Sequence, residues 1–364
     1  MKVLNILGSL NYSGAEIMIL ATNNDFKKKG IVNDILITQK IKGNAYYLFK
    51  KKNFYIEEIF FSKLKILKIL INFFIFIKIL LFLLKKRYDV VIIHTEANTF
   101  KLALASMIVK RTKIIRVVHN VFNPNLILRL RRKLIFYFLK FFRVKIVSVS
   151  RCVKKNEFKL YKNRSFLINN FLNHNKFRLL KNKIKDKNLL KIFVVGNCSK
   201  IKNHQIIFKS LSKLPSNINW RLTHIGKECQ FKNERILAKR LGILKKCKFL
   251  GEVFDWSKYV NRNDIYINSS TNEGIGISNL EACSLGMIPL LSNVPGNKTI
   301  LNSIKNISDL QFSNEESLLK KILKISNYSN NKKNLVTKKI SKKVNTLFSK
   351  DKYVNSYFNL LNKN

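Results

Sequence analysis

Residues 264–292 read DIYINSSTNEGIGISNLEACSLGMIPLLS. They divide into a short apolar run, Ile265–Asn268, a polar loop with two glycines, a helical stretch, and a second apolar run, Ile288–Leu291. Short apolar runs bounded by polar residues favour buried strands. A glycine-containing loop between a strand and a helix suits a phosphate, because the first helical N–H groups and the helix dipole stabilise negative charge. The stretch therefore predicts an α/β fold with an anion-binding turn.

The same alternation of apolar runs and longer helical stretches continues through the rest of the chain. It is the pattern of repeated βαβ units, so we expect parallel sheets covered by helices. A polar stretch rich in Lys and Asn, from about Asn173 to Asn188, interrupts the alternation and indicates a boundary between two domains, which suits 364 residues. The other predicted strands are Val3–Leu7, Asp34–Ile37, Val90–Ile93, Ile114–Val118, Lys145–Val149, Lys191–Val195, Trp220–Ile225 and Lys248–Leu250.

The composition is strongly basic. Lys plus Arg number 70 against 20 Asp plus Glu, a formal charge of +50, which predicts attraction to nucleic acid, anionic lipid or phosphorylated substrates. The excess of Lys, Asn, Ile and Phe runs through the whole chain and also fits the bias of an AT-rich genome. The 46% hydrophobic content excludes a disordered chain, but net charge by itself does not choose a partner.

The cysteines and the N-terminus bear on the cell compartment. The five cysteines form no C-x-x-C pair, so their spacing indicates neither a zinc site nor a disulfide framework, and a reducing cytosol is the simplest home. Residues 1–8 resemble a first strand and lack the apolar core of a signal peptide, so we expect no secretion.

Two stretches of the first half differ from ordinary surface helices. Ile69–Leu84 is apolar except for Asn72 and Lys78. A helix that spans a membrane needs roughly 20 apolar residues, and this stretch is shorter. The stretch Leu126–Arg143 carries a basic stripe beside a broad apolar one, as helices in a membrane interface do; the alternative is a core helix with a solvated basic face. The basic stripe is Arg129, Lys133, Lys140 and Arg143, and the apolar one is Ile127, Leu130, Leu134, Phe138 and Phe141.

Two glutamates stand out around the anion-binding turn. Carboxylates are good acceptors for sugar and ribose hydroxyls, and Glu273 in the loop and Glu281 in the helix can address different parts of one ligand. The spacing from Ser278 to Glu281 is also that of a capping box, with Ser278 at the N-cap. Spacing by itself favours this structural role for Glu281.

This segment resembles the E-x7-E signature of glycosyltransferase family 4, whose members have the two-domain GT-B fold and retain anomeric configuration. The resemblance implies two Rossmann-like domains facing each other across a cleft. It assigns the donor sugar to Glu273 and the ribose hydroxyls to Glu281. The diphosphate falls to the backbone of Gly274, Ile275, Gly276, Ile277 and Ser278.

Other segments are similar to the same family in order and spacing. Gly196 and Lys202 match its diphosphate-binding turn, although Asn197 stands where an arginine is usual and Lys200 could supply that cation instead. Gly14 matches the glycine turn after the first strand, with Ser13 replacing a glycine. His119, at the end of a predicted strand, matches the histidine that faces the transferred sugar, and His94 occupies the same position on the preceding strand.

The resemblance covers nearly the full chain and implies its domain roles. Residues 1–172 would bind the acceptor, 173–189 would be a linker, 190–346 would bind the nucleotide sugar, and a C-terminal helix at 347–364 would cross back to the first domain. Ser148, Ser150 and Asn170 match a family pattern before the linker, where Phe171 replaces a glycine.

The expected reaction is hexosyl transfer from a UDP- or GDP-linked sugar to a lipid-linked or growing glycan of a bacterial surface polysaccharide, such as lipopolysaccharide or capsule. No Asp-x-Asp motif occurs, so we expect no metal and no cofactor. Lys202 and the helix beginning near Ser278 would stabilise the departing diphosphate. We expect a cytoplasmic protein held at the inner face of the cell membrane through residues 64–87 and 126–143, and no nucleic-acid partner.

Two rival interpretations remain. A basic nucleic-acid-binding protein would explain the charge, but the chain has no recognised binding motif and its aromatic residues fall mainly in apolar runs. A catalytically degenerate transferase kept as a binding subunit would explain Ser13 and Asn197. Intact Glu273, Glu281 and Lys202 argue against it.

Overall fold

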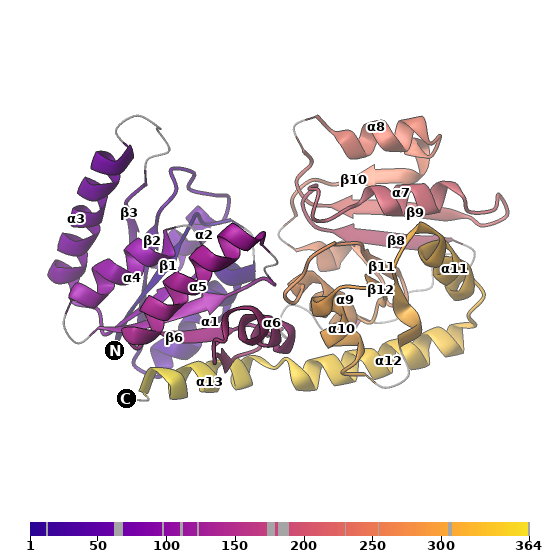
Figure 1. Ribbon diagram of the computed structural model, residues 1–364. Helices are drawn as coiled ribbons and strands as arrows, with labels where there is room; N and C mark the ends of the chain where they lie inside the picture. The colour runs from indigo at the N-terminus through magenta and orange to yellow at the C-terminus, as the bar shows by residue number, and fades with distance from the viewer. Residues whose placement is uncertain are drawn as a thin grey trace. The chain divides into compact units, whose positions relative to one another are not determined.

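The computed structural model divides the chain into two compact units, residues 1–170 with 350–364, and residues 171–349. It describes all residues except 12–13, 62–67, 97, 110–111, 122–123, 173–178, 181–188, 230, 254, 305–307 and 363–364. Ser13 and most of the predicted linker thus lie outside the described residues. Each unit is a parallel sheet with helices on its faces (Figure 1), which confirms the predicted pair of Rossmann-like domains.

The first unit is built on a seven-stranded sheet of order β3-β2-β1-β4-β5-β6-β7. All its pairings are parallel, and strands β1, β4 and β5 are apolar over almost their whole length because both faces of the sheet are covered. The strands are β1 (Lys2–Leu7), β2 (Val32–Ile37), β3 (Ile56–Glu58), β4 (Val90–Ile93), β5 (Lys113–Val118), β6 (Lys145–Ser148) and β7 (Phe166–Leu167).

Six of the seven helices described in the first unit form two groups, and α2 belongs to neither. Helices α3, α4, α5 and α6 pack in sequence, each on the next, whereas α1 packs against α13, the C-terminal helix. Lys350 of α13 forms an ion pair with Asp25 of α1 at 3.0 Å. The helices are α1 (Gly14–Lys28), α2 (Tyr46–Lys51), α3 (Lys68–Lys86), α4 (Thr99–Ile108), α5 (Leu126–Phe141), α6 (Arg151–Tyr161) and α13 (Lys350–Asn362).

The second unit has a six-stranded sheet of order β10-β9-β8-β11-β12-β13, again with parallel pairings. Its strands are β8 (Leu190–Val195), β9 (Trp220–Ile225), β10 (Cys247–Phe249), β11 (Ile265–Asn268), β12 (Ile288–Ser292) and β13 (Gln311–Phe312). Its helices are α7 (Gln205–Ser212), α8 (Asn233–Arg240), α9 (Ile277–Leu285), α10 (Pro295–Leu301), α11 (Glu315–Ser326) and α12 (Asn330–Leu347), with short 3-10 turns η1 (Leu244–Lys246), η2 (Trp256–Tyr259) and η3 (Ser308–Leu310).

Every predicted strand is present, with ends that differ by two residues at most. The strands that the sequence did not predict are β3, β7 and β13, which have three, two and two residues and lie at the edges of the sheets. Segments this short carry no apolar periodicity that could indicate a strand.

The two unusual helices differ in how they bury their apolar residues. Helix α3 buries Ile79 and Leu83 but leaves Phe73 and Phe74 exposed. Helix α5 buries Phe136 and Leu139, whereas its whole predicted apolar stripe from Ile127 to Phe141 is exposed, so the core-helix interpretation of that stripe is wrong. Among the helices that the structure describes, none is both long and apolar enough to cross a bilayer.

Candidate functional site

The carboxyl ends of two neighbouring strands carry the predicted donor-binding residues. In the second unit β8 lies between β9 and β11, and the chain leaves β8 and β11 toward opposite sides of the sheet order. In open α/β sheets of this kind ligands bind outside the carboxyl ends of the strands at this switch point. Gly196 follows β8 and Glu273 follows β11, so the topology brings these two segments together.

Lys202 and Glu273, which are 71 residues apart in the chain, meet at this position. Lys202 Nζ donates to Glu273 Oε1 at 2.5 Å, and Ser270 Oγ donates to the same oxygen at 2.9 Å. The Glu273 side chain is 11% exposed and that of Lys202 28%, so water screens this ion pair only in part. A lysine ammonium has three N–H donors, so Lys202 can hold Glu273 and still donate to a phosphate.

Glu281 has a different partner. Trp256, in the η2 turn, donates from Nε1 to Glu281 Oε2 at 3.0 Å, and both side chains are buried. The Trp256 ring also stacks on Tyr266 of β11, with ring centroids 6.4 Å apart. A carboxylate offers roughly four acceptor positions, and the Trp256 N–H uses one of them.

The capping-box interpretation of Ser278 and Glu281 is wrong. Helix α9 begins at Ile277 with Gly276 at its N-cap, and no side chain caps it. The Ser278 hydroxyl instead lies 3.0 Å from the Tyr266 hydroxyl, within hydrogen-bond distance, and the Glu281 carboxylate accepts from Trp256 Nε1. The helix thus begins at Ile277, one residue before Ser278, and the Glu281 carboxylate bonds to Trp256 instead of capping the helix.

A glycine is needed at the N-cap of α9 because a buried asparagine lies against it. A Cβ atom on Gly276 would lie 2.6 Å from Nδ2 of Asn279. That amide accepts from the Tyr266 hydroxyl at 2.8 Å and donates to Asn297 Oδ1 at 2.7 Å, so it is held in place. The intervening loop residues Gly274 and Ile275 are buried as well. The packing of Asn279 against Gly276 therefore holds the backbone at the predicted diphosphate position in place.

The turn after β8 is joined to the turn after β9. Gly196 has φ +155°, and Gly226, which follows β9, has φ +149° with its Cα so close to Gly196 that a Cβ would lie 2.2 Å from the Gly196 carbonyl oxygen. Asn197 Oδ1 accepts from Lys227 N at 2.8 Å, so the residue that replaces the usual arginine ties the two turns together. Sequence reasoning missed Gly226, although it follows its strand in the same way that Gly196 does.

In the first unit the predicted residues lie at the equivalent strand ends. Gly14 is the first residue of α1, and His94 and His119 directly follow β4 and β5. Ser148 and Ser150 have partners inside this unit: Ser148 Oγ hydrogen-bonds Ser165 Oγ at 2.7 Å, and Ser150 caps α6.

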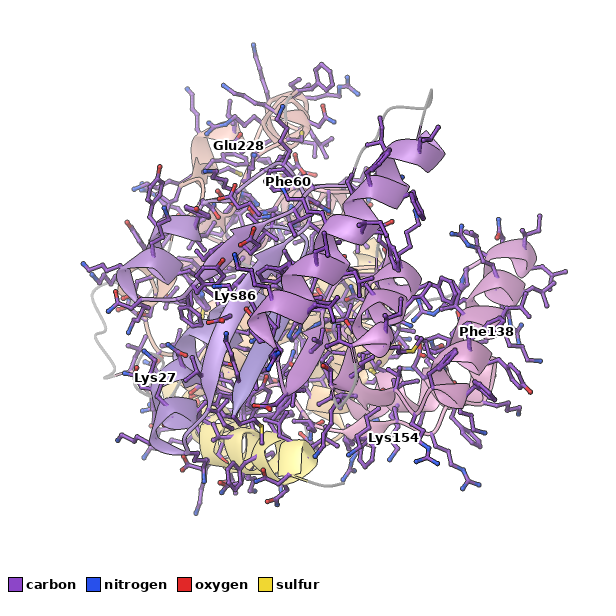
Figure 2. The ribbon with its side chains drawn as sticks, turned by 90° about the vertical axis from the view of Figure 1, so that its left-hand side faces the viewer. Lys27, Phe60, Lys86, Phe138, Lys154 and Glu228 are labelled. Carbon is purple, nitrogen blue, oxygen red and sulfur yellow. The ribbon has the colours of Figure 1, made fainter. Side chains whose placement is uncertain are left out.

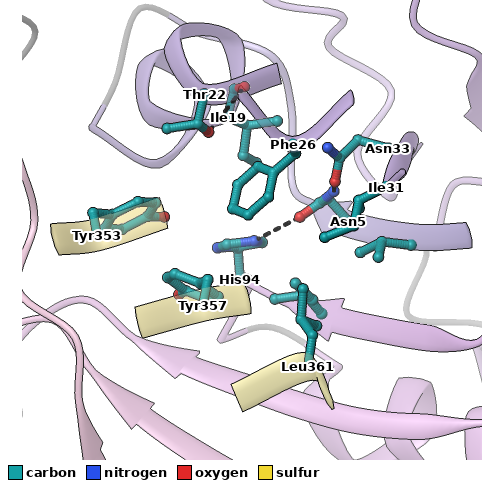
Figure 3. Close-up of a pocket in the computed structure, with 12 residues that line it drawn as sticks. Asn5, Ile19, Thr22, Phe26, Ile31, Asn33, His94, Tyr353, Tyr357 and Leu361 are labelled. Carbon is teal, nitrogen blue, oxygen red and sulfur yellow. Dashed lines mark hydrogen bonds between the residues drawn. The ribbon is translucent and has the colours of Figure 1, made fainter. Parts of the chain in front are cut away.

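A chain of hydrogen bonds orients His119. Asn5 Oδ1 accepts from His94 Nε2 at 3.3 Å (Figure 3), which leaves His94 Nδ1 to accept from His119 Nε2 at 3.2 Å. Asn5 is itself oriented, because its amide donates to Asn33 Oδ1 at 3.1 Å. Burial lowers the pKa of His119 to about 4, and burial together with the charge of His119 lowers that of His94, so both rings are neutral at pH 7.

His94 also lines a small pocket whose walls come from both ends of the chain. Figure 3 shows its ring between Phe26 of α1 and Tyr357 of α13, with Tyr353 nearby. The C-terminal helix thus lines the pocket beside His94. His94 is a site residue that the sequence indicated only by its position at a strand end.

Comparison with known proteins places these observations in a family context. Residues 175–343 match the family model described as "Glycosyl transferases group 1". A search of curated proteins found no match to this sequence.

Solved structures are similar over nearly the whole chain. A glycosyltransferase from Rickettsia africae is 19% identical, with a TM-score of 0.78 over 99% of this chain and 97% of the other. Alr3699/HepE of Anabaena in complex with UDP is 15% identical, with a TM-score of 0.79 over 99% of each chain. The lipopolysaccharide outer core galactosyltransferase WaaB is 16% identical, with a TM-score of 0.70 over 99% of this chain and 100% of the other. The chain therefore has the GT-B fold, and the match of residues 175–343 to the group 1 glycosyl transferases supports a glycosyltransferase.

Proposed function

We propose that this protein is a retaining glycosyltransferase of family 4 that moves a hexosyl group from a UDP- or GDP-linked sugar to a lipid-linked or growing glycan. The observation that carries the proposal is the meeting of Gly196, Lys202 and Glu273 at the switch point of the second sheet, in front of the N-terminus of α9. The carboxyl ends of neighbouring parallel strands at such a switch point, together with a helix N-terminus, suit a nucleoside diphosphate.

The proposed roles follow from the contacts. Lys202 and the N-terminus of α9 stabilise the charge on the departing diphosphate, and Glu273, held by Lys202 and Ser270, contacts the donor sugar. Glu281 accepts from the ribose hydroxyls, and neutral His119 faces the transferred sugar. The acceptor hydroxyl attacks from the face that the diphosphate leaves, without a metal ion and without a nucleophilic carboxylate.

The complexes of Alr3699/HepE with UDP and with UDP-glucose support UDP as the first donor base to test. The direct experiment is thermal unfolding of the protein with UDP, GDP, ADP and CMP and their sugars, since a ligand that binds the folded state raises the unfolding temperature. The stabilising donor is then supplied in labelled form with a membrane extract as acceptor. Absence of stabilisation by every nucleotide would contradict the proposal.

Variants test the proposed roles. Lys202→Ala and Glu281→Gln should each abolish transfer, while Lys209→Ala, an exposed lysine on the neighbouring α7, should leave it unchanged. Lys200→Ala examines whether Lys200 supplies the cation that Asn197 does not. Nucleotide binding without turnover on any acceptor would instead favour the degenerate binding subunit.

We also propose that α5 holds the protein on the anionic inner surface of the cell membrane, where lipid-linked acceptors lie. Phe138 is 49% exposed and Phe141 74%, and Figure 2 shows Phe138 on this helix. Four basic side chains, Arg129, Arg131, Lys133 and Lys140, are exposed along the same helix. Exposed apolar side chains beside basic ones match the boundary between acyl chains and anionic headgroups.

Vesicle flotation tests this surface. Vesicles with anionic lipid should carry the protein up the gradient, neutral vesicles should carry less, and Leu134→Ser with Phe141→Ser should abolish flotation. Tyr47→Ser is a matched control, because Tyr47 is an equally exposed aromatic residue on α2. Flotation of the double variant equal to that of the wild type would refute the proposal. Salt-sensitive binding of the protein to RNA, without binding to vesicles, would favour the nucleic-acid alternative.

A further inference from the structure

Three metal-ligating side chains that are scattered in the sequence meet behind the turn after β8. Cys198 lies two residues after Gly196, His204 directly precedes α7, and His224 is on β9, where it pairs in register with Val194 of β8. One ligand atom from each of the three lies within 4.8 Å of the others. The spacing of the cysteines in the sequence indicated no such site, because two of the ligands are histidines on other elements.

The cluster contains nitrogen atoms that the protein leaves without partners. His204 is 3% exposed and His224 1%, and among the described residues neither Nδ1 atom has a hydrogen-bond partner. A buried polar atom left unsatisfied costs about 1–3 kcal/mol. An ion bound through His204 Nδ1 would satisfy the lone pair that the hydrogen bonds of the described residues leave without a partner.

A carboxylate borders the cluster. Glu234 of α8 places Oε1 at 3.7 Å from His204 Nδ1 and Oε2 at 3.6 Å from Cys229 Sγ. Carboxylate oxygens are common zinc ligands, so the position of Glu234 beside His204 lets it serve as a further ligand.

We propose that Cys198, His204 and His224 bind a zinc ion, with Glu234 as the fourth ligand. One thiolate, two imidazoles and a carboxylate are a donor set that suits Zn²⁺. With Zn–S of about 2.3 Å and Zn–N of about 2.0–2.1 Å, tetrahedral geometry separates sulfur from nitrogen by about 3.6 Å. The Cys198 Sγ and His224 Nε2 atoms are 3.7 Å apart, so this pair already has the required spacing.

Binding requires small adjustments and releases one proton. The Cys198 thiol loses its proton to solvent as the zinc–sulfur bond forms, and no electron is transferred. His224 Nε2 also lies 3.0 Å from the Gly196 carbonyl oxygen, so ligation through Nε2 exchanges that hydrogen bond for a bond to the ion. The site is thus distinct from Lys202 and Glu273 but shares the turn at Gly196.

The test uses the full chain, stripped of metal and titrated with Co²⁺, whose bond to a thiolate gives a charge-transfer absorption. We expect saturation at one equivalent and displacement by Zn²⁺. Cys198→Ser should abolish the absorption, and His224→Gln should weaken binding at least tenfold. Cys152→Ser, which alters a half-buried cysteine of the first unit, should titrate like the wild type.

The wild-type titration decides the matter even where a variant does not fold. Absence of the thiolate absorption in the wild type, or its persistence in Cys198→Ser, would overturn the proposal. Stabilisation by UDP is measured in parallel on metal-free protein. Nucleotide binding without cobalt binding refutes the zinc site only, and cobalt binding without any nucleotide response refutes the transferase proposal only.

Discussion

Gly296, the second residue of α10, supports the loop that carries Glu273. A Cβ atom at this position would lie 2.4 Å from the carbonyl oxygen of Glu273, 2.7 Å from its carbonyl carbon and 2.9 Å from that of Gly274. These neighbours are backbone atoms, which cannot rotate away as the end of a side chain can. Gly296→Ala therefore requires the loop to move by about 1 Å before contacts return to van der Waals distance.

The expected cost follows from this overlap. Inserting a methyl group into a close-packed region typically costs about 1–3 kcal/mol. For a unit of this size each kcal/mol corresponds to about 2–4 °C in the unfolding temperature. The same displacement moves Glu273 relative to Lys202, and a misplacement of about 1 Å at a reacting centre can reduce turnover roughly 100-fold.

Calorimetry with and without UDP, followed by a transfer assay, measures both effects. Thr299→Ala is the matched control on the same helix, because the Thr299 hydroxyl donates to the Pro295 carbonyl one turn earlier and does not support the loop. We expect Thr299→Ala to bind UDP and turn over like the wild type. A Gly296→Ala protein with wild-type unfolding temperature, UDP stabilisation and turnover would refute this reasoning about the loop.

Three further predictions follow from the contacts and charges. Burial raises the pKa of Asp264 to about 7 from 3.8, so the free energy of unfolding should fall as pH rises from about 4 to 7. Asp264→Asn should remove that fall, which is worth roughly 2–4 kcal/mol and is measured by urea unfolding at several pH values. The same dependence of the unfolding free energy on pH in the variant and the wild type would contradict this prediction. His94→Ala should reduce turnover and let water reach His119, which raises the pKa of His119 toward its ordinary value. The dependence of turnover on pH should then show an ionisation near pH 6. A dependence of turnover on pH that is unchanged in the variant would show that His94 does not position His119. A double-mutant cycle of Lys202→Met and Glu273→Gln should give a coupling free energy of about 1–3 kcal/mol in unfolding, and additive effects would show that their contact is unimportant.

The sequence by itself determined the α/β class, the strands of the sheet interiors and the position of the glycine-containing turn between β11 and α9. Strands that are buried on both faces are mainly apolar, and this requirement is readable in runs such as Val90–Ile93 and Ile288–Leu291. Edge strands such as Gln311–Phe312 escaped prediction because pairing with a neighbour, instead of local pattern, makes them strands.

The tertiary structure decided which side chains meet. Local spacing assigned Glu281 to a helix cap, but the helix starts at Ile277 with Gly276 at its N-cap, and Trp256, 25 residues away, donates to the carboxylate. The same holds for Lys202 with Glu273 and for Cys198 with His224, which come together because β8 lies between β9 and β11. Strand order is set by how whole elements bury their apolar faces against one another, and no local stretch of sequence contains that information.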